Sequence, residues 1–380
     1  MTLLLVVAMA VTLASALAVV VFWGNTICRG NTPVSFFTFM AILFTSGLDV
    51  GLLMFPLVDF ELYAEDATYG FANPLAIEFG FWGFLVWGLY FLSTVYFCLL
   101  EPRLRLFELP LIRWVNAFVV LATCAFTAYL FFSYLPDYIS GISDFWRYTL
   151  VVLAIVAAVV SSTKIQFVKV LSIASVVMFG MLLVGLWWQS GMLLAGMVSS
   201  LSLLADYFQN IHRFVFPLSD YHAFYLFWWF AWSIMIGQFV SRFVGGLKAW
   251  QLLLSLLVVP SIPIAVWFSV LYFYFDSALA IAPIAYALMV SVGVVFLINS
   301  VDSLVRLYTE AVGLTVERFG VGRYIVLNVL LLVGLVLLYQ FTPMQIQWIG
   351  VVVIAIYGVV YLLVIQKRRA WSGAIGKPGW

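Results

Sequence analysis

Eleven long apolar runs constrain the fold of this chain more than any other feature of its sequence. Crossing roughly 30 Å of hydrocarbon takes about 20 mostly apolar residues, and each of these runs approaches or exceeds that length. The runs cover about residues 2–24, 34–58, 75–100, 114–133, 146–163, 167–189, 224–244, 251–274, 280–304, 324–341 and 346–365. Only 9% of the 380 residues are charged and 66% are hydrophobic, which excludes a soluble globular domain. The sequence therefore predicts an all-α polytopic membrane protein with about 11 transmembrane helices.

Basic residues are divided unevenly between the two sides that these spans define. One side carries 15 of the 17 Lys and Arg residues, namely Arg29, Arg103, Arg105, Arg113, Lys164, Lys169, Arg242, Lys248, Arg306, Arg318, Arg323, Lys367, Arg368, Arg369 and Lys377. The other side has only Arg147 and Arg213. Since cytoplasmic loops hold the excess of positive charge, we expect the N-terminus outside and the C-terminus in the cytoplasm. The first run lacks the basic start of a signal peptide, so we expect it to remain as a helix.

The segments outside the spans leave little room for chemistry. The longest, residues 191–223, is expected to lie in the outer interface as an amphipathic helix. Three cysteines and two histidines form no metal-ligand pattern, and a net charge of +1 gives no reason to expect nucleic-acid binding. We therefore expect no enzyme, no metal centre and no cofactor, so that function lies within the helix bundle.

Two acidic residues fall inside the spans, where charge is costly and usually serves a function. Asp302 lies near the inner end of the ninth span, and Asp49 lies midway along the second. Glu78, close to the outer end of the third span, is interpreted as an interfacial carboxylate. Gly47 and Gly51 flank Asp49 and a proline follows, which predicts a helix that breaks at mid-membrane beside an enclosed cavity. The alternative is a seam of small residues at which helices pack closely.

Two spans each present three aromatic residues on a common side. In the third and seventh spans, respectively, these are Trp82, Trp87 and Tyr90, and Trp228, Trp229 and Trp232. If the two sets face each other, their rings form a cage suited to a quaternary ammonium group, which ring quadrupoles attract. The alternative is ordinary core packing or the interfacial aromatic belt.

Over nearly its whole length, the chain resembles the betaine/carnitine/choline transporter (BCCT) family. The segments that carry the resemblance are Gly47-Leu48-Asp49-Val50-Gly51, Phe81-Trp82-Gly83, Trp87-Gly88-Leu89-Tyr90, Phe224-Tyr225-Leu226-Phe227-Trp228-Trp229-Phe230-Ala231-Trp232 and Asn299-Ser300-Val301-Asp302-Ser303. The chain departs from the family pattern in that Asp49 replaces a glycine, Phe81 a histidine and Asn299 a threonine. It also lacks the first of the family's usual twelve helices.

The resemblance implies a LeuT-like fold of two inverted five-helix repeats with one additional N-terminal helix. The segments would be an N-terminal helix and loop at 1–32, the first repeat at 33–190, the interfacial helix at 191–223, the second repeat at 224–365 and a short cytoplasmic tail at 366–380. The second and seventh spans would be the two discontinuous helices of the core.

The resemblance also implies two sets of site residues. The substrate-binding residues would be Trp82, Trp87, Tyr90, Trp228, Trp229, Trp232, Asp49 and Met54. The coupling-ion residues would be Gly47, Leu48, Asp49, Asn299 and Ser300, with Na⁺ or H⁺ as the ion.

The expected function is secondary active transport in the bacterial cytoplasmic (inner) membrane. The solute would be a quaternary-ammonium or related methylated compound such as choline, betaine or carnitine, imported by alternating access with a coupled cation, and family members are often homotrimers. The charge of Asp49 favours a choline-like cation over a zwitterion. One alternative is a sodium-independent carrier, either proton-coupled through Asp49 or Asp302 or a substrate/product exchanger. Another is a non-transporting LeuT-fold subunit or sensor.

Overall fold

The chain is an all-α polytopic membrane protein. Its structure, a computed structural model, describes residues 1–47, 50–164 and 166–366. Within these residues, ten helical segments are long and apolar enough to cross a membrane, namely Thr2–Trp23, Pro74–Leu104, Pro110–Tyr138, Asp144–Ser161, Val170–Ser190, Asp220–Phe243, Ala249–Asp276, Pro283–Val312, Val321–Phe341 and Ile346–Gln366. Each of the ten overlaps one of the predicted runs, and the second run has no counterpart among them.

In the second run the structure describes three helices, with an interruption at Phe55 before Pro56. These are α2 (Phe36–Gly47), α3 (Gly51–Met54) and α4 (Pro56–Glu65). Leu48 and Asp49 lie outside the described residues.

The expectation of a second discontinuous helix in the seventh run is wrong. Helix α13 (Asp220–Val240) is continuous over 21 residues and leads into the short η6 (Ser241–Phe243). It is the third run that is divided, into α5 (Pro74–Trp82), η2 (Phe84–Val86), α6 (Trp87–Val95), the π-helical η3 (Tyr96–Leu100) and α7 (Glu101–Leu104).

The remaining helices complete the bundle. The long ones are α1 (Thr2–Trp23), α8 (Pro110–Tyr138), α9 (Asp144–Ser161), α10 (Gln166–Ser190), α14 (Ala249–Val258), α15 (Ser261–Asp276), α16 (Pro283–Val312), α18 (Val321–Phe341) and α19 (Ile346–Gln366). The short ones are η1 (Ala67–Tyr69), η4 (Leu106–Glu108), α11 (Leu194–Ser202), α12 (Ala205–Gln209), η5 (Arg213–Val215) and α17 (Val316–Phe319). Residues 191–223 thus form short helices rather than the single interfacial helix expected.

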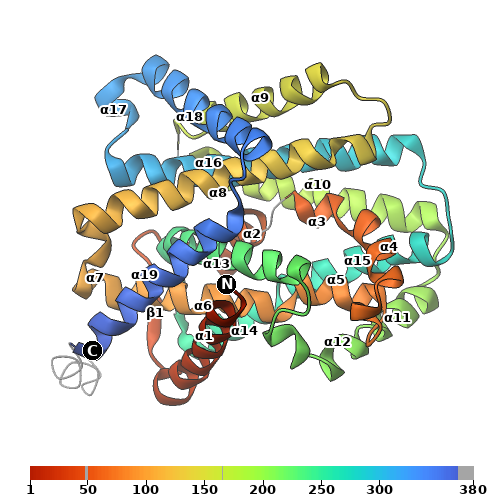
Figure 1. Ribbon diagram of the computed structural model, residues 1–380, viewed down its shortest axis with the longest axis horizontal. Helices are drawn as coiled ribbons and strands as arrows, with labels where there is room; N and C mark the ends of the chain where they lie inside the picture. Colours follow the sequence, from red (N-terminus) through yellow and green to blue (C-terminus); the bar gives the residue numbers. More distant parts are fainter. Residues whose placement is uncertain (48–49, 165, 367–380) are drawn as a thin grey trace.

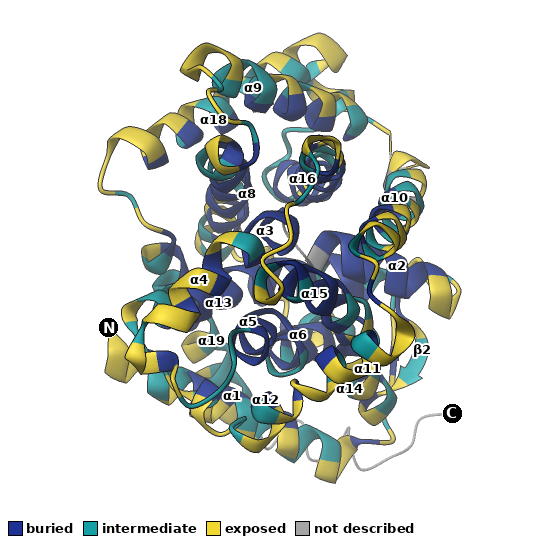
Figure 2. Ribbon diagram, turned by 90° about the vertical axis from the view of Figure 1, so that its right-hand side faces the viewer, coloured by how far each residue is buried: buried dark blue, intermediate teal, exposed yellow. Residues whose placement is uncertain are grey.

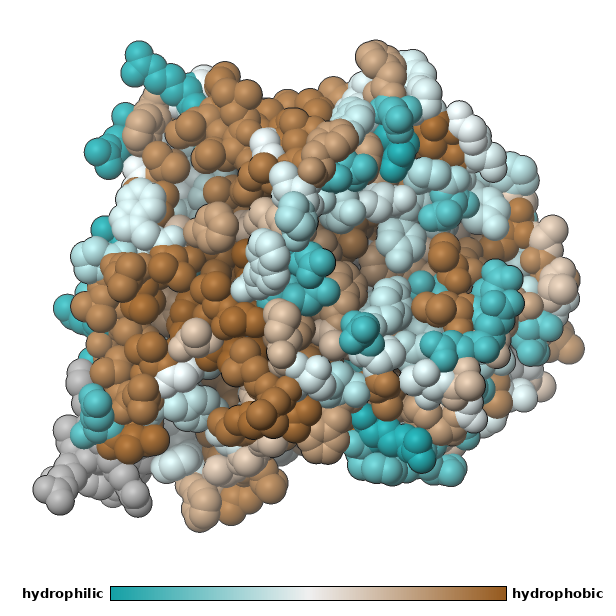
Figure 3. Space-filling view, in the orientation of Figure 1, coloured by the Kyte–Doolittle hydropathy of each residue, from teal (hydrophilic) through white to brown (hydrophobic). Residues whose placement is uncertain are grey.

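Burial separates a central group of helices from a peripheral one. Viewed end-on, α3, α5, α6, α13 and α15 lie in the middle, whereas α1, α9 and α18 lie at the edge (Figure 2). In the most apolar window of each span, 83% of Asp220–Phe243 is buried, against 22% of α1, α18 and α19. The exposed surface over these peripheral helices is largely hydrophobic (Figure 3), as expected of side chains that face lipid.

The connecting segments gather at two opposite ends of the bundle (Figure 1). At one end, strands β1 (Ile27–Arg29) and β2 (Gly245–Lys248) pair antiparallel, which joins the segment after α1 to the segment after α13. At the other end, the Asn73 side chain donates to Asp206 at 2.8 Å, which ties the start of α5 to α12. The spans therefore alternate in direction between these two ends.

Gly237 allows α13 to cross α6 closely, and we expect Gly237→Ala to destabilise the fold. A Cβ at this position would overlap the Ser93 side chain and come within 2.8 Å of the Ser93 carbonyl carbon, which rotation of a side chain cannot relieve. Overpacking of this kind costs about 1–3 kcal/mol. The measurement is the thermal unfolding midpoint of the purified protein in detergent.

The matched control is Gly334→Ala in α18, where a Cβ would meet no other atom within 4 Å. Its midpoint should stay the same or rise, since alanine favours helix by up to about 1 kcal/mol. Equal midpoints for the two variants would contradict the close crossing.

Candidate functional site

One face of α13 carries a row of aromatic side chains through the centre of the bundle. The helix starts after Ser219, whose hydroxyl accepts a hydrogen bond from a backbone N–H of the first turn at 3.0 Å, as an N-cap residue does. Tyr221, Tyr225, Trp228 and Trp232 follow at intervals of four, three and four residues. These intervals place all four on the same side of the helix.

The opposing aromatic residues lie on either side of a helix break. Gly83, at the end of α5, has extended backbone angles (φ −105°, ψ 174°), and Phe84 has φ 39°. A positive φ is uncommon for a residue with a side chain, so neighbouring contacts must hold the turn in place. The third span, predicted as one run over about 75–100, is therefore interrupted, and the break separates Trp82 from Trp87 and Tyr90.

Tryptophan side chains pair with the carbonyl groups that this break frees. The Trp87 indole N–H donates to the carbonyl oxygen of Trp82 at 3.0 Å. The Trp229 indole N–H, from α13, donates to the carbonyl oxygen of Phe81 at 2.8 Å. Two of the predicted site residues thus hold the broken backbone with their N–H groups while their rings remain in the core.

Backbone N–H groups beyond the break have partners as well. Phe84 N–H donates to the Ser261 hydroxyl oxygen at 2.7 Å, and Leu85 N–H donates to the Tyr207 hydroxyl oxygen at 3.2 Å. Ser261 belongs to α15 and Tyr207 to α12. The break is therefore a paired structure that three neighbouring elements support, rather than a frayed helix.

In the second span, too, aromatic side chains donate to carbonyl groups that lack a helical N–H donor. Pro56 has no N–H, so the carbonyl of Leu52, four residues earlier, lacks its helical donor. The indole N–H of Trp267 fills that place at 2.9 Å. The hydroxyl of Tyr138 lies 2.8 Å from the carbonyl oxygen of Met54 and donates to it. Aromatic donors from α15 and α8 thus satisfy the carbonyls of α3.

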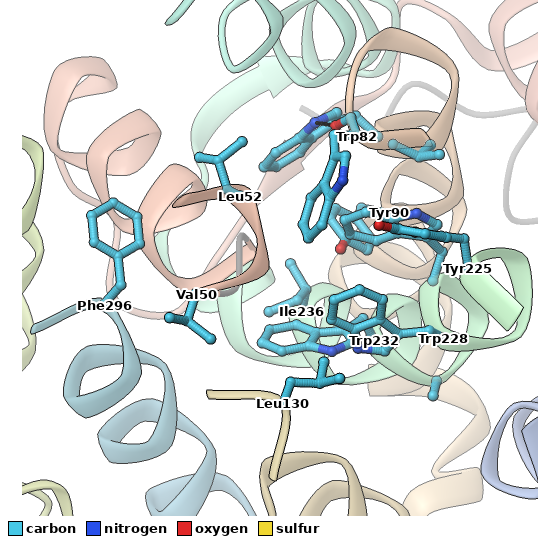
Figure 4. Packing of buried hydrophobic residues seen from close by; sticks show 14 of the residues in the cluster. Val50, Leu52, Trp82, Tyr90, Leu130, Tyr225, Trp228, Trp232, Ile236 and Phe296 are labelled. Carbon is cyan, nitrogen blue, oxygen red and sulfur yellow. Dashed lines mark hydrogen bonds between the residues drawn. The ribbon is translucent and has the colours of Figure 1, made fainter. Parts of the chain in front are cut away.

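The aromatic rings of the two spans meet in the middle of the bundle (Figure 4). The Trp82 ring makes edge-on contacts with Trp228 and Trp229, with centroids 5.4 and 5.3 Å apart. Tyr90 lies 6.1 Å from Trp229 and 5.3 Å from Trp87. All five side chains are at most 2% exposed, so the sets predicted to face each other are in contact and closed to solvent.

Two other predicted substrate-binding residues lie apart from this ring cluster. Trp232 is buried, and among the described residues its ring makes no contact with another aromatic ring. The Met54 sulfur lies 4.0 Å from the position that a Cβ would take on Gly293. Met54 therefore lies close to α16.

Three indole N–H groups in this region are buried without a hydrogen-bond partner among the described residues. They belong to Trp82, Trp228 and Trp232. A buried donor without an acceptor costs about 1–3 kcal/mol, and native proteins leave few such groups. The region therefore combines ring faces, which attract cations, with donors that can hold an acceptor.

The predicted ion-site residues on α16 lie beside the end of α2. The Asn299 amide donates to the carbonyl oxygen of Thr45 at 3.1 Å, and the Ser300 hydroxyl donates to the same oxygen at 3.3 Å. Ser172, from α10, donates to the Asn299 side-chain oxygen at 3.3 Å. Oxygen atoms from three helices thus gather next to the second-span break.

Leu48 and Asp49 lie outside the described residues, so their predicted roles stay predictions, as does that of the neighbouring Gly47. Gly51, on the far side of the break, has a clear packing role. A Cβ there would lie 2.6 Å from the Trp82 ring. Glycine therefore lets Trp82 pack directly against the start of α3.

Asp302 has a structural partner. Its carboxylate lies 3.0 Å from the Arg306 guanidinium, and both side chains are almost fully buried. Arg306 also donates to the carbonyl oxygens of Ser161 and Lys164 at 2.7 and 2.6 Å. This ion pair ties α16 to the end of α9.

A second buried acidic group was not predicted from the sequence. Glu78 is 0% exposed, so its interpretation as an interfacial carboxylate is wrong. Asp59 of α4 is 3% exposed, and both carboxyl groups contact tyrosine hydroxyls, including that of Tyr221 at 2.7 Å from Asp59. The four- and three-residue intervals from Tyr221 to Tyr225 and Trp228 could have predicted that these side chains share one face of α13. No local sequence pattern could have predicted that this face contacts Asp59.

Comparisons with known proteins leave the family unassigned. No protein-family model matches the chain, and no curated protein matches it. Among solved structures, a similar one is that of a Na⁺-coupled sialic acid symporter in a substrate-bound, outward-open state. It is 14% identical with a TM-score of 0.41, and the match covers 96% of this chain and 84% of that one. At this level the likeness identifies neither the substrate nor the coupling ion, so the BCCT resemblance rests on the sequence motifs.

If the Trp229 N–H supports the third-span break, Trp229→Phe should destabilise the protein more than Trp232→Phe. Both changes remove a similar amount of buried ring, but only the first leaves a carbonyl, that of Phe81, without its donor. Hydrogen bonds between membrane helices contribute about 0.6 kcal/mol on average and up to about 1.7. Thermal unfolding of both variants in the same detergent measures the difference, and equal shifts would contradict this role.

Proposed function

We propose that the chain is a secondary transporter that binds a quaternary-ammonium or related methylated solute between α5–α6 and α13. The observation that carries the proposal is the contact of aromatic residues from these elements beside two broken spans. Secondary transporters build binding sites from broken helices near the midplane. Here each break is held by side-chain donors, so neighbouring helices can define its geometry.

The chemistry of the ring cluster supports a methylated ammonium ligand. Such a group cannot donate hydrogen bonds, so ring faces rather than carbonyls are its best partners. Each contact contributes about 0.5–1 kcal/mol at exposed sites and about 2 kcal/mol or more when desolvated. The rings of Trp82, Trp228 and Trp229 are at most 2% exposed, so the larger contribution per contact, that of a desolvated site, is the relevant one.

The proposed transport mode is import by alternating access in a LeuT-like arrangement, with repeats at 33–190 and 224–365. The ring cluster is closed here, so binding requires Trp82 of α5 and Trp228 of α13 to separate. A cycle in which α13 moves relative to α5 and α6 would open the cluster to one side at a time.

The proposed orientation places the N-terminus outside and the C-terminus in the cytoplasm of a bacterial inner membrane. Arg242, in the segment after α13, pairs with Glu310 at 2.8 Å at the same end as the strand pair. Arg306 contacts the end of α9 near this end as well. The grouping of basic residues at one end of the bundle supports a cytoplasmic assignment for it.

The proposed coupling ion binds beside the end of α2. Thr45, Asn299 and Ser300 supply oxygen atoms there, and unwound carbonyls near helix breaks hold Na⁺ in transporters of this kind. A sodium gradient imposed at fixed pH and voltage should then drive uptake. An uptake rate that does not change with the sodium gradient would favour a sodium-independent carrier or an exchanger.

Choline should bind at least about tenfold more tightly than dimethylbutanol, its neutral isostere in which carbon replaces nitrogen. The rings attract the positive charge by about 2 kcal/mol when desolvated, and about 1.4 kcal/mol corresponds to a factor of ten in affinity. Isothermal titration of the purified protein with each compound measures the ratio. Equal affinities would contradict recognition by ring faces.

The variant for this measurement is Trp228→Leu, which removes a ring whose N–H has no partner among the described residues. It should weaken choline binding and leave dimethylbutanol binding nearly unchanged. The matched control is Trp188→Leu on α10, whose side chain is 89% exposed and which should bind choline as the unmodified chain does.

Asp49→Gly should remove a preference for choline over glycine betaine. A carboxylate in contact with a cation gains about 4 kcal/mol at an effective dielectric constant of ~20, before desolvation costs, and the carboxylate of a zwitterion would oppose this gain. Competition by both compounds against radiolabelled choline uptake into proteoliposomes measures the preference. The same selectivity in both proteins would contradict a substrate contact by Asp49.

A further inference from the structure

Two buried carboxyl groups and three tyrosines form a cluster at the end of the bundle where α4, α5 and α13 meet. The Asp59 Oδ2 atom accepts hydrogen bonds from Tyr221 at 2.7 Å, Tyr225 at 3.2 Å and Tyr63 at 3.3 Å. The Tyr63 hydroxyl also lies 2.8 Å from Glu78 Oε2. One phenol therefore bridges the two acids, and this acid–tyrosine cluster joins α13 to α4 and α5.

No cationic side chain forms an ion pair with either acid among the described residues. The titratable groups that face the acids from the surrounding elements are Tyr63, Tyr69, Tyr134, Tyr138, Tyr221, His222 and Tyr225. On the α15 side, Tyr272 packs against the Phe60 ring. The His222 ring carries no second proton, because its Nδ1 accepts from Leu218 N–H at 3.1 Å. Two negative charges would thus be buried together without a cation beside them, which costs several kcal/mol per charge.

The count of hydrogens in the cluster shows where one more proton fits. Tyr63 has a single O–H group but contacts both acids. If both acids were ionised, the Tyr63 hydrogen could lie in only one of these contacts, and the other would bring two oxygen atoms together with no hydrogen between them. A proton on Glu78 Oε2 would let Glu78 donate to the Tyr63 oxygen while Tyr63 donates to Asp59. Both Tyr63 contacts, at 2.8 Å to Glu78 and at the longer 3.3 Å to Asp59, then have their own hydrogen.

The other Glu78 oxygen points independently to the same protonation state. Glu78 Oε1 is fully buried, and no donor among the described residues reaches it with hydrogen-bond geometry; the donor that interacts with this carboxyl group is the Trp82 indole N–H, which itself has no acceptor in that geometry. An unpaired buried oxygen is far more costly on a carboxylate than on a neutral acid. The Glu78 environment is therefore that of a carboxylic acid, whereas Asp59 Oδ2, with three phenol donors, has the environment of a carboxylate.

We propose that Asp59 and Glu78 form a proton-binding site with Tyr63 as the relay between them. The proton moves when Glu78 donates to the Tyr63 oxygen and Tyr63 passes its own hydrogen to Asp59, so that no charge is created and no other bond changes. Tyr221 and Tyr225 contact Asp59 only while α13 lies against α4. Separation of α13 from α4 would remove two donors from the carboxylate and favour its protonation, which links proton binding to the opening of this end.

A short route connects the cluster with the surface. Tyr221 is only partly buried, and the preceding residue, Asp220, is exposed. Asp59 contacts the Tyr221 hydroxyl directly, so one side chain separates the buried acid from the end of the molecule that carries α11 and α12. Protons can therefore reach the site from the side that the proposed orientation places outside.

The first experiment detects the proton without any substrate. Infrared spectra of the full chain in lipid vesicles at neutral pH should contain the C=O band of a protonated carboxyl group, and Glu78→Gln should lose that band. The matched control is Glu65→Gln, which changes an exposed acid of α4 and should retain it. Absence of the band in the unmodified chain, or its persistence in Glu78→Gln, would overturn the site.

Tyr63→Phe tests the relay and covers the case in which Glu78→Gln does not fold. It removes the bridging hydroxyl but leaves both acids, so the band should remain and shift to the higher frequency of a carboxyl group without a hydrogen-bond acceptor. An unchanged band in this variant would overturn the relay.

The second experiment concerns transport and rests on the proposed function. A pH gradient, acidic outside, at fixed sodium and voltage should increase choline uptake into proteoliposomes severalfold, and Tyr63→Phe should abolish the increase. Uptake that is indifferent to the gradient would overturn the coupling. Absence of any choline uptake would instead count against choline as the substrate, because the infrared result does not depend on it.

Discussion

The requirement that every backbone polar group inside a bilayer finds a partner within the protein determines how this molecule is built. Two of its spans are broken, and each break frees carbonyl groups that lipid cannot satisfy. Indole N–H groups of Trp87, Trp229 and Trp267 donate to carbonyls beside these breaks. Trp87 and Trp229 also bring rings into the central cluster, so backbone support and the ring surface come from the same residues. Substitution of such a residue therefore alters the geometry of the breaks together with the ring surface.

Much of the fold was predictable because its causes are local in sequence. Runs of about 20 apolar residues give the spans, and two glycines with a following proline predict the break of the second span. The helical periodicity of Trp228 and Trp229, and of Trp82 and Tyr90, was enough to predict that two aromatic sets share a core, although it could not reveal their contacts.

What was missed depends on contacts between distant segments. Gly83 alone does not predict a break, since glycine is common in membrane helices. The break is stable because Ser261 and Tyr207, more than 100 residues away in sequence, accept from the N–H groups that follow it. Glu78 was misassigned for the same reason. Its distance from the span end suggested the interface, but the α13 side chains that pack around Phe81 and Asp59 bury this end of the helix.

The two acidic sites of the bundle differ in how their charge is balanced, and this difference assigns them different parts in a transport cycle. Asp302 is paired with Arg306, a guanidinium that stays protonated in proteins and that also ties α16 to the end of α9. Because the two residues are four positions apart on one helix, movement of α16 relative to its neighbours does not separate them. The Asp59 carboxyl has only phenol donors around it, two of them on α13, so its charge is stabilised by an arrangement that helix movement can undo. The hydrogen bonds to Asp59 therefore depend on the position of α13 relative to α4, whereas the partner of Asp302 lies one turn away on the same helix and moves with it.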